Sequence, residues 1–514
     1  MLEKIDLTKT MSKEEYQAIK PAMEARLGEL QRQCRTLNIP VMIAFEGFGA
    51  AGKGLQIGEL IQSLDPRGFH VFAIKKENEE EQMRPFMWRF WTKTPERGRI
   101  AIYDGSWYRK VNIDRFEKRT KKKDLPNMFQ SIRSFEKQLT DDGNVLIKLF
   151  LAVNQKEQKK RFQKLLDNKE TAWRVSEGDL KRNMQFDKYQ GMMEELLRQT
   201  DTEDAPWAII EATDRRFATI KIYNIVIKAL AEQIEKVEKA NVRAEAVKSN
   251  LGLAQDTPLH VVVKEADERI KIMQDSVLAK ADLSLSCSKK EYRMKLKKLQ
   301  GKMELLHSEL YRLRIPVVLG FEGWDAGGKG GALKRLTAKM DCRGFVVNPT
   351  ASPNDIEKAH HYLWRFWQAM PKAGHIALFD RTWYGRVMVE RIEGFCARDE
   401  WQRAYKEINN MEKDLADAGA IVIKFWMQID KDEQERRFKE RQENPEKQWK
   451  ITDEDWRNRE KWDQYEDAVN EMLIRTSTDY APWVVVEGND KYYARIKVLE
   501  TVVGAIEKRI SQSR

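Results

Sequence analysis

Cysteine and long apolar runs are what this sequence has little of. Its 514 residues include four cysteines, and their separations fit neither a metal site nor a redox pair. They are Cys34, Cys287, Cys342 and Cys396. No stretch of about eighteen apolar residues occurs, so no helix is expected to span a membrane. The polar, acidic N-terminus differs from a secretory signal. We therefore expect a cytoplasmic protein with reduced thiols.

Length and charge set two further limits. A chain of 514 residues exceeds a single hydrophobic core, which predicts at least two domains. It carries 92 Lys and Arg against 81 Asp and Glu, a formal net charge of +11. An excess of positive charge favours an anionic partner, although a lysine-rich protein without one would have the same composition.

The sequence contains two copies of one unit. The segment VMIAFEGFGAAGKG, with Lys53, returns as VVLGFEGWDAGGKG, with Lys329, at an offset of 329 − 53 = 276 residues. The same offset relates other matched segments without insertion or deletion. They are Arg67–Phe69 with Arg343–Phe345, Trp88–Trp91 with Trp364–Trp367, Asp104 with Asp380, and Ala205–Trp207 with Ala481–Trp483. This regularity predicts a tandem duplication, with modules at residues 2–238 and 278–514 and a connector at 239–277.

Each copy has the pattern of an α/β fold. In the second copy, short apolar runs predict buried parallel strands at residues 316–321, 376–379, 421–425 and 483–486. Apolar residues at helical spacing predict helices at residues 289–312 and 330–340. Short apolar strands that alternate with long amphipathic helices predict a parallel sheet flanked by helices on both faces.

A glycine loop follows the first of these strands. Its sequence, GWDAGGKG, lies between a predicted strand and a predicted helix, which is the context of a phosphate-binding P-loop. Gly323, Gly328 and Gly330 let the backbone approach phosphate, and Lys329 adds a positive charge. The alternative is a plain strand-to-helix turn. The glycine and lysine pattern occurs twice in the chain, which argues against this alternative. Gly330 replaces the usual metal-binding Ser or Thr, so other side chains must supply metal ligands.

A second motif, FDRTWYGR, follows the next predicted strand. It lies at the sheet edge where ligands bind in open α/β folds. Asp380, with Asp325 of the loop, is predicted to hold Mg²⁺ or Mn²⁺. Arg381 and Arg386 suit the negative charge of transferring phosphoryl oxygens, although a surface ion-pair cluster would contain the same residues.

The first copy lacks three of these side chains. Gly49 stands at the position of Asp325, Gly105 at that of Arg381, and Lys110 at that of Arg386. We therefore predict that the first module is degenerate and inactive, and that the second is catalytic.

These motifs resemble a known family. GWDAGGKGG, DRTWYGR and YLWRFW together are similar to the polyphosphate kinase 2 family, over both copies. The resemblance implies a P-loop kinase fold with a helical lid in each module. It also implies transfer of a terminal phosphate between inorganic polyphosphate and nucleotides with Mg²⁺. Fused two-module members resemble enzymes that convert AMP to ADP. By this resemblance Asp325, Lys329, Asp380, Arg381 and Arg386 are active-site residues.

The lid is expected at residues 435–450. A basic helix there would follow a polyanion without reading a sequence, but a solvated helix face would also be basic. The candidate polyphosphate ligands are Arg437, Lys439, Arg441, Lys447 and Lys450. The first copy has Gln163, Leu165 and Thr171 in place of the second, third and fourth of these, which favours a functional role.

The predicted reaction is direct in-line transfer from polyphosphate to AMP. Neither motif contains a histidine, which argues against a phosphohistidine intermediate, and we expect His360 and His361 on a helix surface. Three alternatives stay open: the same reaction with ADP or GDP as acceptor, an ATP-dependent nucleotide kinase, and a polyanion-binding protein without activity. We expect no nucleic-acid or membrane partner, and a homo-oligomer.

Overall fold

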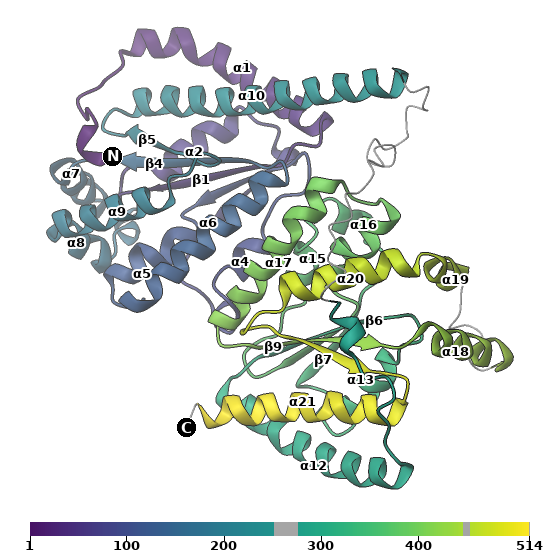
Figure 1. Cartoon of the computed structure of the whole chain (residues 1–514). Coiled ribbons are helices and arrows are strands. Elements are labelled where there is room, and N and C mark those ends of the chain that lie inside the picture. The colour runs from purple at the N-terminus through teal and green to yellow at the C-terminus, as the bar shows by residue number, and fades with distance from the viewer. Residues whose placement is uncertain (251–275, 446–452, 513–514) are drawn as a thin grey trace. The chain divides into compact units, whose positions relative to one another are not determined.

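The computed structural model describes residues 1–250, 276–445 and 453–512 (Figure 1). Each copy contains one sheet of five parallel strands. The first sheet consists of β1 (Val41–Gly47), β2 (Phe69–Ala73), β3 (Ile100–Asp104), β4 (Val145–Ala152) and β5 (Trp207–Glu211). The second consists of β6 (Val317–Gly323), β7 (Phe345–Pro349), β8 (Ile376–Asp380), β9 (Ile421–Gln428) and β10 (Trp483–Glu487).

The two sheets have the same topology. The strand order is β2-β3-β1-β4-β5 in the first and β7-β8-β6-β9-β10 in the second. Val41 pairs with Ile100 in the first sheet and Val317 with Ile376 in the second, so the register also keeps the 276-residue offset. The four strands predicted for the second copy are confirmed. The edge strand β7 was not predicted, and its Val346 and Val347 are 60% and 40% exposed.

Helices connect the strands. In the first copy they are α1 (Lys13–Thr36), α2 (Lys53–Gln62), α3 (Glu79–Gln82), α4 (Trp88–Trp91), α5 (Ile113–Phe116), α6 (Leu125–Asp141), α7 (Gln155–Leu166), α8 (Glu177–Met184), α9 (Phe186–Thr200) and α10 (Arg215–Asn250). In the second they are α12 (Lys289–Leu313), α13 (Lys329–Thr337), α14 (Asp355–Lys358), α15 (Trp364–Gln368), α16 (Val389–Glu393), α17 (Arg398–Asp417), α18 (Lys431–Glu443), α19 (Asp453–Glu460), α20 (Trp462–Thr476) and α21 (Lys491–Ser511). No helix among the described residues has the length and apolar character needed to cross a bilayer.

The helices of the second copy cover both faces of its sheet, as predicted (Figure 1). The helices α12, α13 and α21 pack on one face, where their apolar side chains join those of β6, β8 and β9 in one core. The helices α17 and α20 lie on the other face. Central strand β6 is buried over its whole length except Gly323, because helices cover it from both sides.

The chain divides into two compact units, and each unit includes one short segment that belongs by sequence to the other copy. Residues 354–361 of the second copy belong to the first unit, and residues 79–85 of the first copy belong to the second. Within the first unit, Arg97 N donates a hydrogen bond to Ala359 O, and within the second, Ala373 N donates to Met83 O, both at 2.8 Å. The two bonds join equivalent positions, because donors and acceptors are related by the 276-residue offset. Each copy therefore contributes the equivalent segment to the other unit.

Two expectations are affected by this arrangement. His360 and His361 are buried within the first unit, where the ring of His361 lies 5.4 Å from that of Trp91. The expectation that these histidines lie on a helix surface was therefore wrong. Residues 239–250 of the expected connector continue α10, and residues 251–275 lie outside the described part of the chain. The domain limits themselves stay a prediction.

A buried polar network fixes the second motif to the sheet. Lys424 of β9 and Glu412 of α17 form an ion pair of 2.6 Å with both side chains fully buried. Glu412 also accepts hydrogen bonds from Trp383 Nε1 at 3.0 Å and Tyr384 OH at 2.8 Å. Both aromatic residues belong to the short 3₁₀ helix η8 (Trp383–Val387), which carries Arg386. The position of Arg386 therefore depends on this ion pair.

Removing the cation of this pair should destabilise the second unit. Lys424→Met leaves the Glu412 carboxylate buried without a positive partner, which costs about 3–5 kcal/mol of unfolding free energy. We expect a clear fall in the melting temperature by calorimetry. The control variant Lys413→Met removes an exposed ion pair with Asp417 of the same helix. The unfolding free energy should then fall by less than about 1 kcal/mol. Equal melting temperatures for the two variants would contradict this account.

Candidate active site

The glycine loop of the second copy has the geometry of an anion-binding turn. Gly323 ends β6 with φ +145°, and a Cβ atom there would lie 2.6 Å from Met427 Cβ, so no other residue fits. Gly328 precedes α13 with φ +109° and provides no side-chain cap. The first N–H groups of α13 are thus directed at the site, where an anion is stabilised. Lys329 Nζ lies 2.7 Å from Gly323 O.

The predicted acidic and basic residues come together at the carboxyl ends of β6 and β8. Asp380 is the last residue of β8 and pairs in register with Phe321 of β6. Arg381 has φ +64°, donates its N–H to Phe321 O at 3.0 Å, and places its guanidinium 3.3 Å from Asp325 Oδ1. One candidate metal ligand, Asp380, therefore ends β8, and the other, Asp325, lies two residues after the end of the adjacent strand β6.

A buried carboxylate joins the two motifs. Glu322, directly before the loop, accepts hydrogen bonds from Thr382 N at 2.6 Å and from Thr382 Oγ1 at 2.8 Å. Burial raises the pKa of Glu322, while the positive charge of Lys329 acts in the opposite direction. Neither Glu322 nor Thr382 was among the predicted site residues. Their contact fixes the turn that carries Arg381 against the glycine loop.

Arg386 lies further along η8. Its guanidinium is 3.1 Å from Glu390 and stacks over the ring of Tyr362 at 4.5 Å from the centroid. The side chain is 15% exposed. Burial is the largest cause that raises the pKa of Glu390, although Arg386 opposes it. A partly buried arginine that a carboxylate holds in place provides a fixed site for an anionic oxygen.

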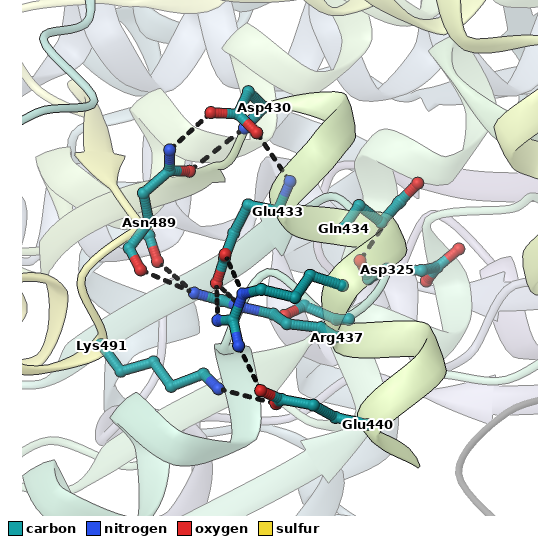
Figure 2. Close-up of polar contacts among 11 residues, drawn as sticks. Asp325, Asp430, Glu433, Gln434, Arg437, Glu440, Asn489 and Lys491 are labelled. Carbon is teal, nitrogen blue, oxygen red and sulfur yellow. Dashed lines mark hydrogen bonds and ion pairs between the residues drawn. The ribbon is translucent and has the colours of Figure 1, made fainter. Parts of the chain in front are cut away.

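Arg437 of α18 connects the glycine loop to the segment after β10 (Figure 2). Its guanidinium donates to Ala326 O at 2.8 Å in the loop and to Gly488 O at 2.6 Å after β10. The side chain is only 3% exposed and also pairs with Glu433. In the first copy, Arg161 donates to the equivalent backbone carbonyls, Ala50 O and Ala212 O. That Arg437 also contacts polyphosphate stays a prediction.

A cavity of about 140 Å³ opens beside the loop. Its lining includes Gly327, Gly328, Arg437, Glu440, Arg441, Lys491 and Arg495. Lys491 Nζ is 3.7 Å from Glu440 (Figure 2). Burial, and next the charge of Arg437, lower the pKa of Lys491. So many cations around one small space, with a single carboxylate, favour an anionic occupant.

The predicted lid cations are divided by the structure. Arg441 lines the cavity, whereas Lys439 is not among the lining residues and forms an exposed ion pair with Glu435 at 2.7 Å. Lys447 and Lys450 lie outside the described residues.

The first copy is different at the corresponding place. Gln56 and Thr219 stand where the second copy has Ala332 and Arg495, and Thr219 Oγ1 donates to Gln56 Oε1 at 2.9 Å. Both side chains are buried. A neutral hydrogen-bonded pair thus replaces a cationic lining residue. Lys110, the counterpart of Arg386, is paired with Glu77 at 2.6 Å.

Sequence reasoning missed Asn458, Lys491 and Arg495. Asn458 Nδ2 of α19 donates to Asp325 Oδ2 at 3.2 Å, and the two others line the cavity. They lie outside the recognised motifs, in segments without a distinctive pattern. A comparison of the two copies contained a signal for two of them, because the first copy has Arg182 in place of Asn458 and Thr219 in place of Arg495.

The carboxylates fit a metal that also uses substrate oxygens. Among the described residues, no three or more His, Cys, Asp or Glu side chains gather as a metal site. Mg²⁺ is commonly held by one or two carboxylates together with substrate phosphates and water. Asp325 and Asp380 would supply the two carboxylates.

The second copy has a glycine loop with a lysine between a central parallel strand and a helix, and an aspartate at the end of the adjacent strand. This arrangement defines a P-loop phosphotransferase. The sequence matches the family described as Polyphosphate kinase 2 (PPK2) twice, over residues 10–239 and 286–514. The chain belongs to this family, which confirms both the resemblance and the duplication.

Full-length relatives agree with this assignment. The polyphosphate:AMP phosphotransferase of Pseudomonas aeruginosa is 39% identical over 99% of both chains. That of Pseudomonas syringae pv. tomato is 35% identical over the whole of both. A crystal structure described as polyphosphate kinase 2 from Pseudomonas aeruginosa superposes with a TM-score of 0.85, at 36% identity and with complete coverage of both chains.

Proposed function

We propose that this protein transfers the terminal phosphoryl group of inorganic polyphosphate to AMP, and that the second copy performs the transfer. An oxygen of the AMP phosphate attacks the terminal phosphorus, and the bond from that phosphorus to the bridging oxygen breaks. The products are ADP and a polyphosphate one unit shorter. The AMP phosphate is already largely ionised at neutral pH, with a second pKa of about 6, so no general base is needed. The full-length relatives named for this reaction support the acceptor.

The roles of the side chains follow from their positions. Lys329 and the N–H groups of α13 neutralise the transferring phosphoryl group, and Arg381 and Arg386 bind its oxygens and those of the acceptor. Asp325 and Asp380 would hold Mg²⁺, which when bound offsets the charge of the phosphates. The observation that carries the assignment to the second copy is the pair Asp325 and Arg381, 3.3 Å apart, since the first copy has glycine at both positions.

The cavity beside the loop provides a place for the polyphosphate chain. A chain with its end at Lys329 continues into the space that Arg441, Lys491 and Arg495 line. Each phosphate carries about one negative charge, so cationic side chains along the path are sufficient to bind the polyphosphate chain. Polyphosphate thus enters beside the loop between α18 and α21.

The acceptor is tested with purified protein, Mg²⁺ and long-chain polyphosphate. AMP, ADP, GMP and GDP are supplied separately, with polyphosphate or ATP as the donor, and the nucleotide products are separated by chromatography. We expect ADP from AMP as the fastest reaction. Faster conversion of ADP or GDP would assign a diphosphate acceptor, turnover only with ATP as donor would indicate an ordinary nucleotide kinase, and binding without turnover would leave a polyanion-binding protein.

The division between the copies is tested at the two loop lysines. Lys329→Ala should lower kcat at least 100-fold, because a charge that stabilises the transition state is lost. Lys53→Ala, the same change in the first copy, should alter kcat less than twofold. The melting temperatures of both variants verify folding. Similar losses in the two variants would contradict a single catalytic copy.

The polyphosphate path is tested at Arg495. Arg495→Thr installs the residue of the first copy and removes one phosphate contact, which should raise the half-saturating polyphosphate concentration about tenfold. The half-saturating AMP concentration should stay within twofold. Lys508→Thr, an exposed change on the same helix, is the control. Equal effects of the two variants, or an effect on AMP alone, would place the chain elsewhere.

A further inference from the structure

The Asp325 carboxylate has two partners, and one of them comes from a distant part of the second unit. Arg381 lies 3.3 Å from Oδ1, and Asn458 Nδ2 donates to Oδ2 at 3.2 Å. Asn458 belongs to α19, which follows the loop by more than a hundred residues. Both oxygens of the carboxylate are therefore oriented by the protein.

Further contacts hold α19 near the loop. Arg459 donates to Lys431 O at 2.5 Å and pairs with Glu435 at 2.7 Å, which attaches α19 to α18. Immediately after α19, the ring of Trp462 stacks on that of Trp324 in the loop, with centroids 3.6 Å apart and planes at 7°. The contact of Asn458 with Asp325 is thus part of a defined docking of α19.

The first copy has changed both members of this contact. The offset places Arg182 at the position of Asn458, since 458 − 276 = 182, and Gly49 at the position of Asp325. Arg182 pairs instead with Asp179 at 2.7 Å and with Glu117 at 3.1 Å. Where the carboxylate is absent, the amide that contacts it is absent too, which argues that the two act together.

We propose that Asn458 is a positioning residue that orients Asp325 for metal binding, so that this ligand is in place only when α19 is docked on the loop. An amide is suited to this role because it donates a hydrogen bond without adding a positive charge that would compete with a metal ion for Asp325. Groups that orient ligands in this way strengthen metal binding substantially. The proposal rests on the proposed function, in which Asp325 is a metal ligand.

The docking is tested without metal or substrate, by hydrogen exchange of the amides in residues 453–460. Asn458→Ala should speed this exchange, as should Asp325→Ala, because either change removes the contact. The double variant should exchange no faster than the faster single variant, since one interaction is lost in all three. Alanine is favourable within a helix, so α19 itself should not be weakened. Additive effects, or unchanged exchange in Asn458→Ala, would overturn the proposal.

The positioning role is tested by titration of Mg²⁺ in the polyphosphate and AMP assay. Asn458→Ala should raise the half-saturating Mg²⁺ concentration about tenfold, with less than a twofold change for AMP. Asn458→Gln keeps the amide and should lie between alanine and the wild type. Glu460→Gln, an exposed change on the same helix, should match the wild type. An effect on AMP alone, or equal Mg²⁺ dependence in all variants, would overturn the proposal.

Failure of the proposed function is recognised separately. It appears as absence of ADP formation by the wild-type protein, whereas the exchange experiment reports the contact of Asn458 with Asp325 regardless of turnover.

Discussion

A loop that directs its N–H groups at phosphate turns its carbonyl groups the other way, and those carbonyls need donors. In the second copy one buried guanidinium, that of Arg437, bonds Ala326 O in the loop and Gly488 O after β10. Burying an arginine costs free energy unless its donors are satisfied, and here the backbone and Glu433 satisfy them. The loop, the end of β10 and α18 are therefore fixed relative to one another, and the site residues depend on that arrangement.

The duplication allows structural requirements to be separated from chemical ones. Both copies keep the arginine that bonds the loop carbonyls, Arg437 and Arg161. Both also keep the buried Lys–Glu pair, Lys424 with Glu412 and Lys148 with Glu136. Both therefore fold in the same way. The copies differ where charged side chains face the expected phosphates, at Asp325, Arg381 and Arg495. Loss of those groups leaves the hydrophobic core unchanged, because none of the three side chains belongs to it.

Much of the second sheet could be predicted because its central strands are buried on both sides and appear as continuous apolar runs. The edge strand β7 was missed, since it is short and its valines are exposed. His360 and His361 were misplaced because a local pattern does not reveal that a short segment packs within the other compact unit. The motif residues could be predicted because their glycines and charges form recognisable local patterns. Asn458 was missed because its role depends on a contact with a residue far away in sequence.

The sequence by itself determined the duplication, the parallel α/β architecture and the positions of the loop and the second motif, because each depends on local spacing or on a repeated pattern. The tertiary structure decided which cations have structural partners. Arg437, which was predicted to bind polyphosphate, is committed to backbone carbonyls, while Lys491 and Arg495 of α21 line the cavity beside the loop. It also decided that Asn458 meets Asp325. Such contacts join helices that are far apart along the chain, and only packing brings them within hydrogen-bond distance.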